Sequence, residues 1–171
     1  MSDLALSFDG ETLTSDIVVG ETDLATDEGL AAAVVISLFT DARARPEDFL
    51  PDDARVPGEA AAYGASGADL ARDRRGWWGD LVPPRQAAEM AEHRTGSRFW
   101  LLSREKQTPE TLRRAEEYAR EALEWLIADG IARAVQVTAF IPRAGWLGLQ
   151  ITIDRPRSRD RFEHVWKTHA V

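Results

Sequence analysis

Few side chains in this sequence stand at spacings that suit catalysis or metal binding. The three histidines, His93, His164 and His169, are scattered, and none has a second ligand three or four residues away on an expected helix. The chain contains no cysteine, which removes thiolate zinc sites, cysteine nucleophiles and disulfides together. We therefore expect no catalytic residue, no metal site and no cofactor.

Two patterns resemble hydrolase signatures but fit that chemistry poorly. Residues 64–68 loosely match the Gly-x-Ser-x-Gly turn of hydrolases, but the last residue is alanine and an acidic loop surrounds it instead of a strand. Glu116, Glu117 and Glu121 could supply a glycosidase pair, whose carboxylates flank a cleft and differ in environment. Here they fall on the charged face of an amphipathic helix, so a solvated, salt-bridging surface is the simpler interpretation.

The balance of charge argues against a nucleic-acid partner. The 171 residues include 21 basic and 29 acidic ones, a net charge of −8, whereas phosphate affinity comes mainly from clustered lysine and arginine. The charge is uneven: residues 1–69 sum to −12 and residues 70–171 to +4, which marks either two interaction faces or a solvated surface. The longest apolar stretch, residues 30–39, is too short to cross a bilayer, and no signal peptide is visible.

The tryptophans are the sharper signal, and all six lie in the second, mildly basic portion. Trp100 and Trp125 fall in apolar patterns and are expected in the core, where a tryptophan buries about 150–250 Å². Trp77 and Trp78 are adjacent in an extended segment and point opposite ways, so one of them is expected to face a partner. The remaining two, Trp146 and Trp166, suit either the edge of a core or an interface.

The first 40 residues predict two strands and a buried helix. Leu4, Leu6 and Phe8 alternate with polar residues up to a turn at Asp9-Gly10, and residues 16–20 supply a strand to pair with them. Asp27 is expected to cap a helix over residues 28–39, which is apolar nearly all round and therefore largely buried.

Residues 41–76 break this regular pattern. They carry three prolines, several glycines and a crowd of acids, so they predict an extended acidic loop that a partner orders. A short helix is expected over residues 85–94, ended by Gly96, and an apolar run follows at residues 99–102.

The clearest expected element is a long amphipathic helix. Thr108 caps it, Pro109 occupies its first turn, and it runs to Asp129-Gly130. Pairs at i,i+4 spacing, Glu110–Arg114 and Arg120–Glu124, are expected on its outer side. Its apolar side is formed by Leu112, Ala115, Ala119, Ala122, Leu123 and Leu126.

Three strands are expected after that helix, at residues 133–141, 146–154 and 161–168. The first two alternate apolar and polar residues around a turn at residues 142–145, so one face of the hairpin can pack on the long helix. The predicted fold class is α+β: a small, mostly antiparallel sheet backed by a long amphipathic helix, with an N-terminal strand pair, a buried helix and a long acidic loop. We expect one domain over residues 1–171, organised as 1–40, 41–76 and 77–171; at this length about 70% of the unfolded surface is buried.

Two motifs carry a resemblance to a known family. Gly-Trp-Trp-Gly-Asp at residues 76–80 and Gly-Ser-Arg-Phe-Trp-Leu-Leu-Ser-Arg at residues 96–104, followed by the long helix and the hairpin, resemble the Mu-type tailed-phage baseplate protein family. The resemblance covers residues 70–168 well and the first strands and acidic loop more loosely. It implies a structural protein of a virion, assembled in the host cytoplasm, and no enzyme.

The resemblance also implies partners and their contact residues. The chain is similar to the wedge proteins that initiate the sheath of contractile tails, which implies contacts with other wedge proteins, the tail sheath protein and spike or hub proteins, in multiple copies with six-fold symmetry. The strands at 133–141, 146–154 and 161–168 are then expected to face the sheath, and an internal charge pair of Asp80 with Arg98 or Arg104 is an alternative to an intermolecular one. The expected partner-binding residues are Trp77, Trp78, Asp80, Arg98, Arg104, Phe162, His164 and Trp166.

Two other functions stay open at this point. A peptidoglycan-degrading, lysozyme-like tail enzyme predicts two acids in differently buried positions of one cleft, and the sequence offers no convincing second acid. A host-encoded protein-binding module predicts a stable monomer without phage genes nearby.

Overall fold

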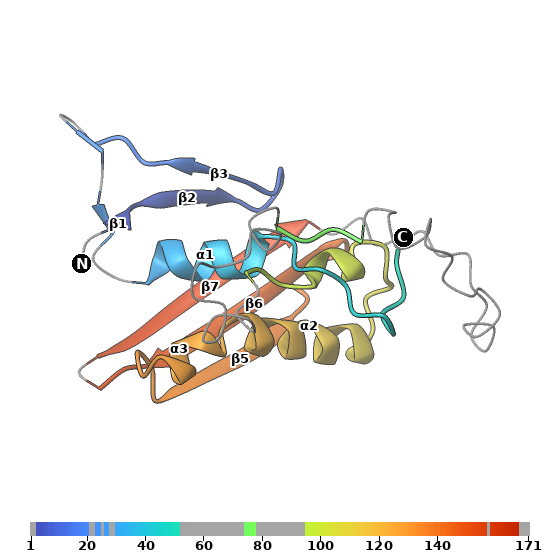
Figure 1. Cartoon of the computed structure of the whole chain (residues 1–171). Coiled ribbons are helices and arrows are strands. Elements are labelled where there is room, and N and C mark those ends of the chain that lie inside the picture. Colours follow the sequence, from blue (N-terminus) through green and yellow to red (C-terminus); the bar gives the residue numbers. More distant parts are fainter. Residues whose placement is uncertain are drawn as a thin grey trace.

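The computed structural model describes residues 3–20, 23–24, 26–27, 30–51, 74–77, 95–156 and 158–167. These residues fold around a three-stranded antiparallel sheet in the order β5-β6-β7, made of β5 (Ala134–Phe140), β6 (Trp146–Asp154) and β7 (Arg159–Lys167). The helices lie on one face of that sheet (Figure 1). The predicted α+β class is confirmed.

The register of the sheet places one apolar row on the helix side. Val137 lies opposite Ile151, and Ile151 lies opposite Phe162 on the next strand. Leu149, Ile151 and Ile153 are fully buried, as the alternating pattern predicts. On the other face, Phe140 covers Gly148, where an added Cβ would stand 2.5 Å from the ring. The three predicted strands agree with the observed ones to within two residues.

The long helix forms as two pieces, α2 (Pro109–Ala122) and α3 (Trp125–Ala128). The predicted cap is confirmed, because the Thr108 hydroxyl accepts a hydrogen bond from the Thr111 amide at 3.2 Å. The predicted apolar side is confirmed too, since Ala115, Ala119, Leu123 and Leu126 are fully buried.

The predicted partners of two arginines on α2 are wrong. Arg114 pairs with Glu105 instead of Glu110, because its guanidinium turns toward the buried Tyr118 hydroxyl next to Glu105. Arg120 pairs with Glu116 at 2.7 Å instead of with Glu124.

Helix α1 (Ala31–Phe39) begins three residues later than predicted, and the expected Asp27 cap is wrong. Leu30 occupies the cap position without a side-chain hydrogen bond. Asp27 belongs instead to β4 (Thr26–Asp27), which pairs with β1 (Asp3–Leu4), so its backbone is committed to a strand. The predicted burial of the helix is confirmed for most of its length, although Ile36 is 45% exposed.

The N-terminal strand pair is confirmed as a hairpin of β2 (Leu6–Asp9) and β3 (Thr14–Ile17), although β3 begins two residues earlier and ends three residues earlier than predicted. Phe8 of β2 stacks on Phe39 of α1 with ring centroids 3.9 Å apart, and His164 of β7 meets both rings edge-on. The Lys167 amide donates to the Gly10 carbonyl at 2.7 Å. The hairpin is therefore fastened to α1 and to the end of β7.

The apolar run at residues 99–102 forms a short 3₁₀ helix, η2 (Phe99–Leu102), with all four side chains buried. Trp100 and Trp125 pack in or against the core as expected. Gly96 has φ +106°, and an added Cβ would stand 2.4 Å from the Thr40 carbonyl oxygen. The glycine is thus required by the close approach of the chain at residues 40–42, while the helix predicted over residues 85–94 lies outside the described residues.

No helix in the described part of the chain is long and apolar enough to cross a membrane.

Candidate assembly surfaces

Arg98 is the centre of a polar network between η2, α2 and the chain segment that follows α1. Only 5% of Arg98 is exposed. Its Nη1 donates to both oxygens of Asp48, at 2.8 and 2.9 Å, and its Nη2 donates to Glu121 Oε2 at 2.5 Å. Its guanidinium carbon also lies 4.4 Å from the centre of the Tyr118 ring. A buried guanidinium is therefore paired on two sides and stacked on an aromatic face.

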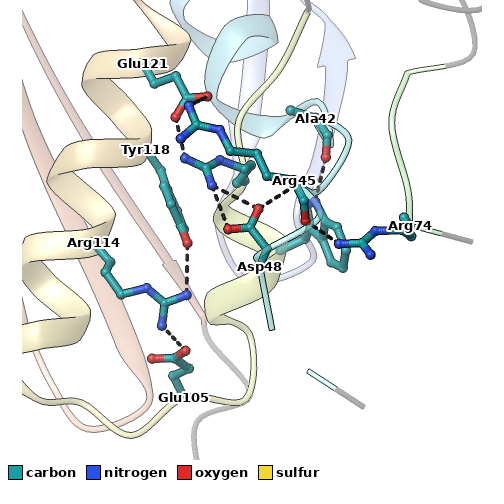
Figure 2. A network of polar contacts seen from close by, with 10 residues as sticks. Ala42, Arg45, Asp48, Arg74, Glu105, Arg114, Tyr118 and Glu121 are labelled. Atoms are coloured by element: carbon teal, nitrogen blue, oxygen red, sulfur yellow. Dashed lines mark hydrogen bonds and ion pairs between the residues drawn. The ribbon is translucent and has the colours of Figure 1, made fainter. Parts of the chain in front are cut away.

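The charge of Arg98 is balanced within the network. Burial by itself lowers the pKa of Arg98, but the hydrogen bonds that it donates to Glu121 and Asp48 outweigh this effect and hold the pKa above its ordinary value. Arg45 lies 2.9 Å from Glu121, so two arginines face two carboxylates. Figure 2 shows this arrangement around Arg45, Asp48 and Glu121. Such pairing is what permits a charge to stay buried.

The network holds the two ends of the segment 52–73 against the core. Asp48 and Arg45 belong to the stretch after α1, where the Arg45 amide donates to Asp48 Oδ2 at 2.7 Å. Arg74, on the other end, donates to the Arg45 carbonyl and accepts a hydrogen bond from the Ala44 amide at 3.2 Å. Residues 41–51 and 74–77 therefore lie side by side. They are irregular, as predicted, but contacts within this chain order them instead of a partner; ordering by a partner stays a prediction for residues 52–73, which lie outside the described residues.

Trp100 completes the attachment of this segment. Its indole Nε1 donates to the Ala42 carbonyl at 2.8 Å. The Arg75 guanidinium lies 5.0 Å from the centre of the Trp100 rings and pairs with Asp41 at 2.7 Å. Residue Ala42 also donates its amide to the Ser97 carbonyl at 2.8 Å. Ser97, Arg98 and Trp100 of the motif at residues 96–104 thus anchor residues 40–48, while its other apolar side chains lie in the core.

Tyr118 joins this network to a second arginine. Its ring is 4% exposed and lies between the guanidinium groups of Arg98 and Arg114. Arg114 donates to the Tyr118 hydroxyl at 2.9 Å and pairs with Glu105 (Figure 2). Burial lowers the pKa of Arg114, and the hydrogen bonds to Tyr118 and Glu105 raise it by more.

The two edges of the three-stranded sheet differ. At β5, the Ala139 amide donates to Glu116 Oε1 at 3.1 Å and the Val137 carbonyl accepts from Arg120 at 3.4 Å. Glu116 and Arg120 are themselves paired on α2. This ion pair occupies two outward groups of β5 and so obstructs the addition of another strand at that edge.

Strand β7 has no second strand neighbour among the described residues. The Lys167 amide bonds to Gly10 and so points away from β6. Because peptide groups alternate in direction along an antiparallel strand, those of Arg161, Glu163 and Val165 point the same way. Among the described residues, the outward edge of β7 therefore has no backbone partner from residue 161 to residue 165.

The structure places several of the predicted partner-binding residues. Arg98 is buried in the network described above, and Arg104 is exposed just after η2. Trp77 is 40% exposed. Trp78 and Asp80 lie outside the described residues, so the expected pairing of Asp80 with Arg98 or Arg104 stays a prediction.

Two of the predicted residues on β7, Phe162 and His164, lie on the helix side of the sheet. Phe162 is opposite Ile151 and packs against the core, and His164 is opposite Leu149. Burial lowers the pKa of His164, which favours the neutral ring, and its Nε2 has no hydrogen-bond partner among the described residues. Trp166 pairs with Leu147 in the register of β6 and β7, and its side chain lies outside the described part of the structure.

Sequence reasoning missed the partners of Arg98. Asp48 is 50 residues away and was grouped with the acids of the loop, and Glu121 was placed on a solvated helix face. The spacing of residues along the chain does not predict contacts of this kind. The available signal was the position of Arg98 directly before an apolar run, because an arginine that becomes buried there needs a carboxylate nearby.

The glutamates of the glycosidase interpretation are engaged elsewhere. Glu116 binds Arg120 and the edge of β5, Glu117 binds Arg113, and Glu121 binds Arg45 and Arg98. In the described ranges, no group of three or more histidines or acids could hold a metal ion.

These features define an α+β protein with an internally braced polar network on one side and an open strand edge on another. The chain belongs to the GP46 family of phage proteins, whose model matches residues 30–160. It is 44% identical over 156 residues to "Baseplate protein gp46" of Escherichia phage Mu, covering 91% of this chain and 89% of the relative. It is 40% identical over 157 residues to "Mu-like prophage FluMu protein gp46" of Haemophilus influenzae, with the same coverage. The predicted Mu-type baseplate family and the location in the virion tail baseplate are confirmed.

Proposed function

We propose that this protein is a wedge component of a contractile-tail baseplate and that it initiates the sheath by accepting a strand at the edge of β7. The observation that carries the proposal is the difference between the two sheet edges. Side chains of α2 bind two outward groups of β5, whereas β7 presents outward peptide groups at residues 161, 163 and 165 without a partner among the described residues. Addition of a strand to such an edge supplies several backbone hydrogen bonds in a fixed register and needs no catalytic group.

The proposed roles of the β7 side chains follow from their positions. Phe162 and His164 pack toward the core and would hold the strand in place, while Trp166 stays a proposed contact. Arg161 and Glu163 are exposed and alternate in charge along the same strand. They would set the register of an incoming strand of the first sheath ring through cross-strand pairs.

The proposed contact with other wedge proteins lies on the side of the polar network. Trp77 is half-exposed beside residues that are anchored to that network, and Trp78, Asp80 and Arg104 extend the same surface in the proposal. Arg98 acts there as a positioning residue, because a side chain 5% exposed offers little area to a partner. Spike or hub proteins would meet the remaining surface, in a six-fold arrangement of copies.

A structural role without hydrolysis is part of the proposal. It is supported by the naming of the phage Mu relative as a baseplate protein and by the engagement of Glu116, Glu117 and Glu121 in ion pairs. Lytic activity of the purified protein on peptidoglycan would contradict this part.

The sheath role is tested by blocking the outward amide of β7. Glu163→Pro removes an amide that points away from β6, so the ladder with β6 is kept while the ring obstructs an incoming strand. In a phage or prophage that lacks its own copy, this variant is expected to join baseplates that carry no sheath, as seen by electron microscopy of tails. Glu163→Ala removes the same side chain, retains the amide and is expected to give sheathed tails.

The test needs a stability control, and one outcome would overturn the proposal. The melting temperature of Glu163→Pro must stay near that of Glu163→Ala, which shows that the fold survives. Sheathed tails at normal length from a folded Glu163→Pro variant would overturn the proposal.

The wedge contact is tested separately with Trp77→Ala and Trp78→Ala. Both changes leave Arg98, Asp48 and Glu121 in place, so the network stays intact. The variants are expected to fold normally and to be missing from purified baseplates, and their full incorporation would contradict the assignment.

A further inference from the structure

The N-terminal strands form an arm whose outer end is uncovered and apolar. Large apolar side chains are exposed there: Leu4 by 38%, Ile17 by 43%, Leu24 by 43% and Val19 by 74%. Scattered exposed apolar residues are ordinary on a protein surface, but a cluster on one element marks a contact site.

The register places these side chains on one face of the arm. Leu6 lies opposite Ile17, and Val19, two residues further along, lies opposite Leu24 in an isolated bridge. Phe8 lies on the same face as Leu6, because side chains two residues apart share a face of a strand. Phe8 is covered by Phe39 and His164. One apolar face thus runs from a covered end at Phe8 to an uncovered end at Val19.

Figure 1 shows the same division, with β2 lying along α1 while the chain beyond β3 extends away from the helices and the sheet. Backbone hydrogen bonds within the arm hold its outer end. The Val18 amide donates to the Ala5 carbonyl at 3.0 Å, and the Gly20 amide donates to the Asp23 carbonyl at 2.7 Å. The arm is therefore an ordered ribbon whose apolar face is covered at Phe8 and exposed from Ile17 to Leu24.

The charges on the arm have a single sign. Residues 1–42 contain nine acids and no lysine or arginine. Asp9 and Asp16 lie on the reverse of the apolar face, opposite Thr14 and Ser7, and Asp23 stands beside the turn at the outer end; all three are exposed. The backbone amide of Glu11 and the hydroxyl of Thr12 lower the pKa of Asp9, which keeps it ionised.

We infer that this arm is a docking element that inserts into a groove on another baseplate protein, a groove with an apolar floor and walls carrying lysine and arginine. Because the ribbon is one layer thick, its apolar face can contact the floor of the groove while the acids on its reverse face contact the walls. Charge complementarity selects the partner and orients the arm, and burial of the outer apolar end provides the contact. This inference goes beyond the strand addition proposed at β7 and does not depend on it.

The test places a photo-crosslinking amino acid at position 19, where the native side chain is 74% exposed, in a protein incorporated into baseplates. The expected product joins position 19 to a lysine- or arginine-containing surface peptide of a different baseplate chain, as mapped by mass spectrometry. Position 117, on the exposed face of α2, serves as the control and is expected to give less of that product. Crosslinks only to a second copy of this chain, or none in assembled baseplates, would overturn the inference.

Charge reversal gives a second measurement. Asp16→Lys with Asp23→Lys is expected to reduce incorporation into baseplates by about tenfold or more, because like charges then face each other at the walls of the groove. Glu110→Lys with Glu117→Lys makes the same change of charge on the face of α2 and is expected to have little effect. Equal incorporation of the two double variants, both folded, would also overturn the inference.

Discussion

The guanidinium of Arg98 and the carboxylate of Asp48 form an ion pair in which only 6% and 10% of the two side chains are exposed. The pair connects the start of η2 to the segment after α1, 50 positions apart in the sequence. A pair so far from water is costly to break, because the partner left behind is a buried charge. It is therefore one of the contacts that hold residues 41–51 in place, beside those of Trp100 and Ser97 with Ala42.

The first prediction concerns this pair. Arg98→Met alone is expected to lower the free energy of unfolding by about 3–5 kcal/mol, because it leaves the Asp48 carboxylate buried without its cation. Asp48→Leu combined with Arg98→Met is expected to cost less than the two single changes added together. Chemical denaturation of the four proteins gives the coupling energy directly.

An exposed ion pair provides the control for this double-mutant comparison. Arg113 and Glu110 are each 61% exposed, and Arg113→Ala is expected to change stability by about 0.5 kcal/mol or less. A similar cost for Arg113→Ala and Arg98→Met would contradict the role assigned to burial.

The second prediction concerns the closed edge of the sheet. Glu116→Ala with Arg120→Ala frees the Ala139 amide and the Val137 carbonyl, so β5 is expected to pair with other chains. Light scattering at rising protein concentration should show more association than the parent protein does. Arg113→Ala with Glu117→Ala removes an equal pair from the outer face of α2 and should leave scattering unchanged; association of both variants alike would exclude the edge as the cause.

The third prediction compares two glycines with positive φ. Gly96→Ala is expected to cost more than about 2 kcal/mol, since its Cβ would stand 2.4 Å from the Thr40 carbonyl oxygen at φ +106°. Gly130→Ala, with φ +70° and no atom within 4 Å of the added Cβ, is expected to cost about 1 kcal/mol. Thermal unfolding of both variants measures the difference, and equal costs would show that the backbone at residues 40–42 moves away from residue 96.

The sequence predicted best what depends on neighbours along the chain. The cap at Thr108, the apolar side of α2 and the three strands all follow from period and local chemistry, and the structure confirms them. Asp27 failed as a cap because a strand partner, β1, uses its backbone, and that pairing has no local signature. The site was less predictable: Arg98 was identified by its motif, but its partners Asp48 and Glu121 are set by tertiary packing.

The last prediction concerns pH. His164 lies against Phe8 and Phe39, and burial lowers its pKa, so the folded protein binds a proton at this ring less readily than the unfolded chain does. Below the unfolded pKa of about 6.5, the unfolded state then binds more protons, and the stability of the fold falls as the pH falls. Above that pKa the ring is neutral in both states, so it does not change the stability with pH.

His164→Phe keeps an aromatic ring at this position without a proton to bind. The free energy of unfolding of this variant is therefore expected to stay constant from pH 7 until carboxylates titrate below about pH 5. Denaturation of the two proteins across this range should show that the parent protein loses stability relative to the variant as the pH is lowered from 6.5. If stability changes with pH by the same amount in both proteins, the ring is protonated equally in the folded and unfolded states.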